Sequence, residues 1–174
     1  MTRNIDKPAD GEFNPYAIMY ISLLPDDGRV LNHLKENGSL IRSFIMQLSE
    51  QKLIHRYAEG KWTVKEILVH IMDDERIYAY RALRIGRNDK TPLPGFEQDD
   101  FVPFSRANDR TVEDIFSEYM SVRNATISLF NSFSDEDLLR TGTANDHTVS
   151  VRALAYHIAG HELHHLNIIR ERYL

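Results

Sequence analysis

The stretch AYHIAGHELHHLNIIRERYL places four histidines close together: His157, His161, His164 and His165. Within it, HELHH satisfies the H-E-x-x-H pattern, in which two histidines bind zinc and the glutamate acts as a general base. Imidazole is the commonest metal ligand among side chains. The pattern therefore raises three alternatives: a zinc protease, a different metal site, or a helix that is rich in histidine for structural reasons.

Helical geometry separates these histidines into two pairs. At about 100° per residue, one apolar stripe of the predicted helix is formed by Val151, Leu154, Ile158, Ile168 and Ile169. His161 and His165 fall inside this stripe at spacing i, i+4, which suits two imidazoles that share one ion. His157 and His164 fall near its edge. The structural alternative is a pair of hydrogen-bonded core histidines, but a bundle core offers few polar partners for two of them.

A third metal ligand is expected from another helix, and His70 is the best candidate because it lies beside Ile67 and Ile71 on an apolar face. His33 is the alternative, in a segment that has the pattern of a solvated helix edge. The two remaining histidines, His55 and His147, fall in predicted loops and are interpreted as surface residues. Three histidine ligands would leave a fourth tetrahedral position for water or substrate, as in catalytic zinc sites.

The protease interpretation is disfavoured by what surrounds the motif. A third ligand usually follows H-E-x-x-H downstream, and after His165 only Glu171 could serve. No alternating pattern predicts a strand that could bind a peptide. Glu162 remains a candidate catalytic acid or base, with a solvated or supporting carboxylate as the alternative.

Two further polar residues interrupt apolar helix faces. Asp74 lies one turn after His70 and is a second candidate catalytic residue; it could also orient a ligand imidazole or pair with an arginine. Arg123 is predicted to face inward on the third helix, where it could bind an anionic group of a substrate or cofactor. The alternative for Arg123 is a buried ion pair, with Asp74 as a candidate partner. Trp62 is interpreted as a packing residue.

Composition limits the classes of function. The chain has 174 residues, of which 42% are hydrophobic and 27% charged, with a net charge of −5. No basic stripe suggests nucleic-acid binding, and no apolar run is long enough to span a membrane. A signal-peptide core is also absent, so the expected location is the cytoplasm. Because there is no cysteine, a metal must be held by histidine and carboxylate, and any reacting thiol must come from another molecule.

The elements that must position these residues are predicted to be helices. Residues 1–12 have the composition of a loose tail, and a short helix is expected within 14–25. Long helices are expected at about 29–48, 63–85, 111–133 and from 150 nearly to the end, with Thr63 and Glu66 as a capping box. Residues 86–110 form a long loop, and 134–139 add one helical turn. The predicted fold is a single all-α domain over residues 1–174: a four-helix bundle with one long crossover loop.

The combination of WTVKEILVH with the later HELHH resembles the DinB/YfiT-like superfamily, and the resemblance covers most of the chain. It implies a four-helix bundle in which one histidine of the second helix and two of the last helix bind a divalent metal. Those positions match His70, His161 and His165. The family includes transferases that use thiols such as bacillithiol or mycothiol, as well as candidate hydrolases, and its members are often homodimers.

Three functional hypotheses follow. The first is a metal-dependent transferase that activates a low-molecular-weight thiol cosubstrate. The second is a metal-dependent hydrolase of a small substrate, with Glu162 or Asp74 assisting proton transfer. The third is a non-catalytic stress-response module with a structural metal. Zinc is the first choice of metal, with Ni, Fe, Mn or Cu as alternatives. The expected partners are a small-molecule substrate and a second copy of the chain, without nucleic acid or membrane.

Overall fold

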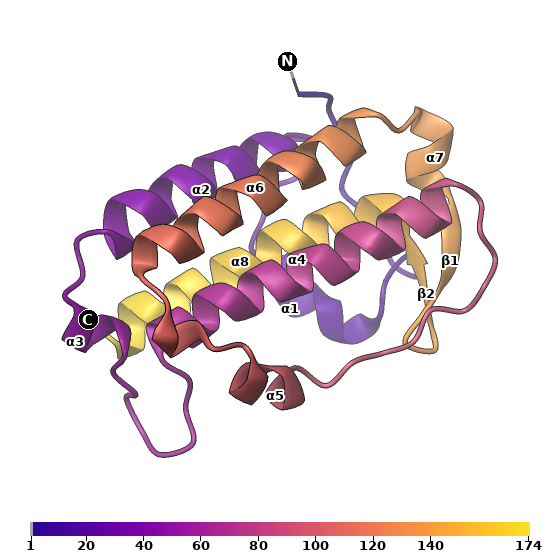
Figure 1. Ribbon diagram of the computed structural model, residues 1–174. Helices are drawn as coiled ribbons and strands as arrows, with labels where there is room; N and C mark the ends of the chain where they lie inside the picture. Colours follow the sequence, from indigo (N-terminus) through magenta and orange to yellow (C-terminus); the bar gives the residue numbers. More distant parts are fainter. Residues whose placement is uncertain (1) are drawn as a thin grey trace.

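The computed structural model, which describes residues 2–174, is a four-helix bundle (Figure 1). Its long helices are α2 (Val30–Ile45), α4 (Val64–Gly86), α6 (Val112–Asn131) and α8 (Val151–Arg172). Helix α4 packs against α8 and α6, and α2 packs against the same two helices. This arrangement confirms the predicted all-α class and makes α8, which carries the histidine motif, a neighbour of both α2 and α4.

Short elements connect the long helices. Between α4 and α6, the predicted crossover contains three single turns rather than a plain loop, and Figure 1 shows it running beside the bundle. The short elements are η1 (Pro15–Ala17), α1 (Ile18–Ile21), α3 (Glu50–Leu53), α5 (Gln98–Phe101), η2 (Val102–Phe104), η3 (Ala107–Asp109) and α7 (Asp135–Leu139). Of these, α1 packs against α8, and α5 lies in the crossover.

The helix that carries His70 begins at the predicted capping box. The Thr63 side chain accepts a hydrogen bond from the Glu66 backbone N–H, and the Glu66 carboxylate accepts one from the Thr63 backbone N–H. Helix α8 begins in a similar way, because the Ser150 hydroxyl accepts from the Ala153 backbone N–H at 3.1 Å. These caps satisfy amide groups that a helix start leaves unpaired, and they fix where each histidine-bearing helix begins.

A β-hairpin precedes α8, contrary to the prediction of an irregular loop. Strand β1 (Thr141–Ala144) pairs antiparallel with β2 (His147–Ser150). Asn145 and Asp146 connect the strands, and both have positive φ values, 50° and 62°. Asn and Asp tolerate this left-handed conformation better than most residues, and two such residues in succession suit a tight hairpin turn.

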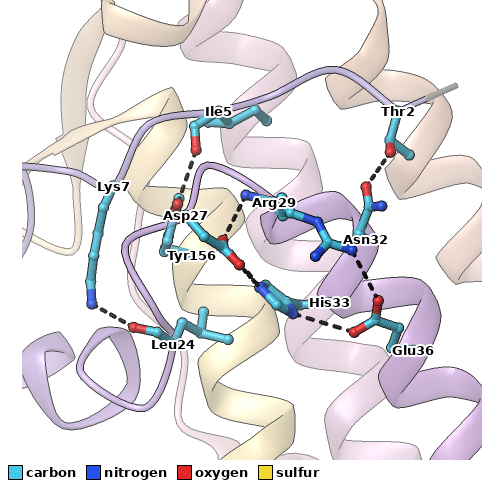
Figure 2. Close-up of polar contacts among 10 residues, drawn as sticks. All are labelled: Thr2, Ile5, Lys7, Leu24, Asp27, Arg29, Asn32, His33, Glu36 and Tyr156. Carbon is cyan, nitrogen blue, oxygen red and sulfur yellow. Dashed lines mark hydrogen bonds and ion pairs between the residues drawn. The ribbon is translucent and has the colours of Figure 1, made fainter.

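Residues 2–12, which the sequence predicts to be a loose tail, contact the bundle at several points; Met1 lies outside the described residues. Ile5 is buried, and its backbone N–H donates to the Gly28 carbonyl at 2.8 Å. Figure 2 shows the Tyr156 hydroxyl donating to the Ile5 carbonyl. Further along, the Glu12 carboxylate accepts from the Arg152 guanidinium. The segment is therefore attached to the first half of α8.

A layer of buried polar side chains crosses the middle of the bundle. The apolar core consists of two clusters, one at each end of the long helices. Along α4, Met72 belongs to one cluster and Ala82 to the other, with Asp74 and Glu75 between them. The same order recurs in α6, where Arg123 separates the clusters.

None of the helices within residues 2–174 has both the length and the hydropathy of a membrane-spanning segment.

Candidate metal centre

The fold brings together the three histidines that the sequence selected as metal ligands. The Nε2 atom of His161 lies 3.0 Å from Nε2 of His70 on α4 and 3.1 Å from Nε2 of His165, one turn further along α8. One ring nitrogen from each residue lies within 4.8 Å of the others. Tetrahedral zinc sites with bonds of about 2.0–2.1 Å separate their ligand nitrogens by about 3.3 Å. The three side chains thus form a group able to hold a divalent ion.

The protonation chemistry of this cluster also fits a cation. An imidazole nitrogen carries either one proton or one lone pair, so His161 Nε2 cannot form a normal hydrogen bond with both neighbours at once. Burial lowers the pKa of His161 to about 3 and that of His165 to about 2, and it also lowers the pKa of His70. All three rings are therefore neutral at pH 7, which is the form that binds metal.

Asp74 lies next to this cluster, on the side of the second ring nitrogen of His161. Its Oδ2 atom lies 3.4 Å from Nδ1 of His161 and 3.4 Å from Nε2 of His157, slightly beyond hydrogen-bond distance. Oδ2 is buried and has no hydrogen-bond donor among residues 2–174. A carboxylate at the second nitrogen of a ligand histidine holds the ring in the tautomer that binds metal. The structure gives Asp74 the position of an orienting residue, one of the alternatives drawn from the sequence.

Aromatic rings enclose the three histidines. The indole of Trp62 lies 4.8 Å from the His70 ring, centroid to centroid, so this residue contacts the centre as well as packing. On the other side, the Tyr20 ring meets His157, His161 and His164 edge to face at 5.1–5.3 Å. These rings cover part of the centre and lower the polarity around it, which strengthens electrostatic interactions among the buried groups.

Tyr20 comes this close because α8 has a glycine at the contact. A Cβ atom on Gly160 would lie 2.2 Å from the backbone oxygen of Tyr20. Only the absence of a side chain at Gly160 lets α1 approach the turn that carries His161.

Two cavities open at the centre, at successive positions along α8. The first, about 260 Å³, includes His165 and is walled by Tyr57, Trp62, Asp99 and Tyr173. The second, about 200 Å³, includes His161 and His157 and is walled by Tyr20, Asp74, Tyr78, Arg81 and Gln98. Consecutive residues of α5, Gln98 and Asp99, line different cavities, so this turn of the crossover lies over the region where they approach each other.

Arg123 does not face either cavity. Its guanidinium donates to both Glu75 oxygens at 2.9–3.2 Å, to Glu162 Oε1 at 2.7 Å, and to the Leu34 carbonyl. These acceptors occupy all its nitrogens. The structure therefore favours the predicted alternative of a buried ion pair over binding of an anionic group, and the partners are Glu75 and Glu162 rather than Asp74.

Glu162 belongs to the same buried network. Its Oε1 atom accepts from Arg123 and from the Tyr119 hydroxyl, while Oε2 has no donor among residues 2–174. Glu162 lines neither cavity described above. Its position suits a structural carboxylate that holds α8 against α6, and it gives no support to the predicted acid–base role.

The remaining histidines lie apart from the cluster or at its border. Figure 2 shows His33 between Asp27 and Glu36, with its Nε2 atom 3.0 Å from the Asp27 carboxylate. His55 and His147 are exposed, as predicted, although His147 begins strand β2 and does not lie in a loop. His164 contacts Tyr20 but is not in the three-nitrogen group.

Comparison with known proteins identifies the family. The sequence pattern of the DinB superfamily matches residues 33–169, a span that contains all three clustered histidines. The chain belongs to the DinB superfamily.

One sequence relative and one structural neighbour of this DinB-superfamily chain are informative. A protein of Oceanobacillus iheyensis, named as a candidate metal-dependent hydrolase, is 25% identical over 128 residues, covering 72% of this chain and 73% of the relative. The structure is also similar to YfiT from Bacillus subtilis, described as "a probable metal-dependent hydrolase with an unusual four-helix bundle topology". That match has a TM-score of 0.75 with 14% identity, and it covers 95% of this chain and 90% of YfiT. At this identity it shows a shared fold.

Sequence reasoning missed several residues around the centre. Tyr20 and Arg81 line the second cavity, yet neither falls in a recognisable motif. His157 was assigned to the edge of the apolar stripe, and the structure stacks its ring on Tyr78 with centroids 3.7 Å apart. Tyr78 lies on α4 about two turns beyond His70 and Arg81 about three turns beyond it, so helical spacing from His70 is the sequence signal that points to both.

Proposed function

We propose that this DinB-superfamily protein is a metal-dependent transferase that joins a low-molecular-weight thiol to a small electrophile. The observation that carries the proposal is the pair of separate cavities that each include one of the clustered histidines, His165 in the first and His161 in the second. Two spaces beside one reactive centre suit a reaction in which each space holds one of two substrates. The chain has no cysteine, so the reacting sulfur must belong to a cosubstrate.

The chemistry required of the site is simple. A divalent ion held by His70, His161 and His165 would lower the pKa of a coordinated thiol. The thiol loses its proton, its sulfur forms a bond to the electrophilic carbon, and the leaving group departs with the electrons of the bond that breaks. His157, beside Asp74 in the second cavity, is placed to accept a proton. Asp74 would keep His161 in the metal-binding tautomer.

Zinc is the proposed ion. Three neutral imidazoles with an open position match catalytic zinc sites, in which three protein ligands leave a place for water or substrate. Asp74 adds a buried negative charge next to the rings, and a divalent cation would compensate it.

A metal-dependent hydrolase is the second candidate, supported by the names of the sequence relative and the structural neighbour. In this reaction water would replace the thiol, and Asp74 with His157 would assist its deprotonation. One cavity would then bind the whole substrate. Glu162 is not included in the proposed reaction, because Tyr119 and Arg123 donate hydrogen bonds to its Oε1 atom.

The first test is metal content after purification without an affinity tag, measured for the wild type and for H70A, H161A and H165A. We expect about one equivalent in the wild type and strong loss in each variant. His164→Ala is the matched control, because His164 lies on the same helix but outside the three-nitrogen group, and it should retain the metal.

The second test separates the candidate functions by turnover. Thiols including bacillithiol, mycothiol and glutathione are combined with the fluorogenic electrophile monochlorobimane. A rate that requires both thiol and metal, and that is lost in H161A, supports the transferase. Metal-dependent release of nitrophenol from nitrophenyl acetate without any thiol, and no transfer to bimane, supports the hydrolase. If the metal raises the melting temperature and neither reaction occurs, the metal is structural.

A further inference from the structure

Arg81 differs from the other buried cationic side chains of residues 2–174 because no carboxylate pairs with it. Arg123 pairs with two glutamates, Lys65 with Glu50, and Glu66 with Arg56. Arg81 is only 4% exposed, yet no carboxylate of residues 2–174 lies within 4.0 Å of its guanidinium. A buried charge is costly unless it is paired, so Arg81 has the property expected of a residue that receives its counterion from a ligand.

The Arg81 side chain is held in place without being neutralised. Its Nη2 atom donates to the Pro94 carbonyl at 2.9 Å, and that acceptor carries no charge. The guanidinium lies over the Tyr78 ring, 4.8 Å from its centroid, and 5.9 Å from the Phe96 centroid. These contacts fix the orientation of the planar group in advance, which lowers the entropic cost of binding a partner.

Arg81 lines the second cavity together with His161, so a ligand of the guanidinium would lie on the substrate side of the centre. The amide side chains of Gln98 and Asn145 line the same space. The cavity therefore combines the positive charge of Arg81, the carboxylate of Asp74 beside the histidines, neutral hydrogen-bonding groups and aromatic walls. This combination is typical of a site that orients a small molecule by one charged end.

We propose that the second cavity binds a small carboxylate, and that Arg81 recognises its carboxylate group. The guanidinium fork matches the two oxygens of a carboxylate. A single negative charge balances Arg81, whereas the second charge of a phosphate would lie in a cavity that Asp74 already makes negative. The inference rests on the proposed function, because it takes this cavity to be the one that binds the electrophile. The electrophile would then be a carboxylic acid.

The test uses benzoate as the probe, because its flat ring suits the aromatic walls. Benzamide has nearly the same shape without the charge, and inorganic phosphate represents the other anion chemistry. Dissociation constants are measured by NMR titration for the metal-loaded protein, the metal-free protein, R81Q and R84Q. Arg84 is the matched control: it lies on the same helix three residues further on, pairs with Asp89, and lines neither cavity.

We expect R81Q to weaken benzoate binding by roughly tenfold or more, as for loss of a hydrogen bond to a charged group. R84Q should bind like the wild type, and benzamide should bind weakly to all variants. The amide signals of Gln98 and Asn145 in the wild type should shift with benzoate and not with benzamide, a measurement that does not depend on R81Q folding.

Several results would overturn the proposal: equal benzoate affinity in R81Q and the wild type, equal binding of benzamide, or tighter binding of phosphate than of benzoate. Loss of benzoate binding on metal removal, with no effect of R81Q, would make the carboxylate a metal ligand instead. We expect benzoate to bind to Arg81 in the metal-free protein as well. A failure to find metal or turnover would therefore contradict the proposed function without deciding whether Arg81 binds a carboxylate.

Discussion

The carboxylate of Asp74 faces the ring of His161 across the α4–α8 interface, with Oδ2 of Asp74 3.4 Å from Nδ1 of His161. Since Nε2 of the same ring points to His70, the two nitrogens of His161 connect the acid to the cluster. Carboxylates in this relationship to a ligand histidine commonly affect metal affinity by about 10–100-fold when they are replaced.

We therefore expect D74N to weaken zinc binding by about 10–100-fold, measured by competition with a chromophoric chelator. Asp73→Asn is the matched control, because the neighbouring Asp73 is partly exposed and lies near Arg76 rather than the histidines. Equal zinc affinity in D74N and D73N would show that Asp74 does not orient His161.

Replacement of Arg123 by methionine should strongly destabilise the fold. It would leave the buried carboxylates of Glu75 and Glu162 without a cation, a change that typically costs about 3–5 kcal/mol. Urea unfolding gives the free energy directly. In the control R76M, a partly exposed pair with Glu118 is lost, and the expected cost is below about 1 kcal/mol. A similar small effect in R123M would mean that the network contributes little.

Gly160 and Gly38 should respond in opposite directions to alanine. At Gly160 the new methyl group would collide with the Tyr20 backbone at 2.2 Å, whereas at Gly38 the nearest atoms lie at 3.5 Å. G160A should lose about 1–3 kcal/mol through overpacking, and G38A should gain up to about 1 kcal/mol of helix propensity. Thermal unfolding of both variants tests this, and a stabilised G160A would contradict the close approach of α1 to α8.

The contact between Glu12 and Arg152 makes stability depend on pH. The hydrogen bond from Arg152 lowers the pKa of Glu12 from 4.5 to about 2. Because the folded pKa is the lower one, the stabilisation is complete above about pH 4.5 and disappears as the pH falls towards 2. E12Q should therefore be less stable than the wild type at pH 7, and the difference should shrink in acid.

Chemical denaturation between pH 7 and pH 3 measures the Glu12 effect. Glu59→Gln is the control, because Glu59 is exposed and forms no ion pair with any other described residue. A difference between E12Q and the wild type that stays constant over this range would rule out the ionised Glu12 as its source.

The sequence predicted those parts of the molecule that depend on local periodicity. Capping at Thr63 and the apolar stripe of the last helix placed His70, His161 and His165 correctly on two helices, and the fold brings them together. Helical spacing works here because residues one turn apart share a face.

What the sequence did not predict depends on long-range contacts. Asp74 and Glu75 are adjacent, and only the packing of α6 against α4 decides which of them meets Arg123. The two strands have four residues each, the shortest length at which alternation is informative, so the hairpin over 141–150 was missed. The N-terminal segment is held by contacts such as that of Ile5 with Tyr156, far apart in the chain.

A metal ion at this centre would also cross-link distant parts of the chain. His70 and His161 are separated by 91 positions, and a metal ion bound to both would close a loop of that length. Cross-links of long loops act mainly by reducing the freedom of the unfolded chain. In a protein without cysteine, an ion at these histidines would take the place of a disulfide. It would link α4 to α8 reversibly, because a chelator would remove it, and a thiol reductant would have no disulfide to reduce.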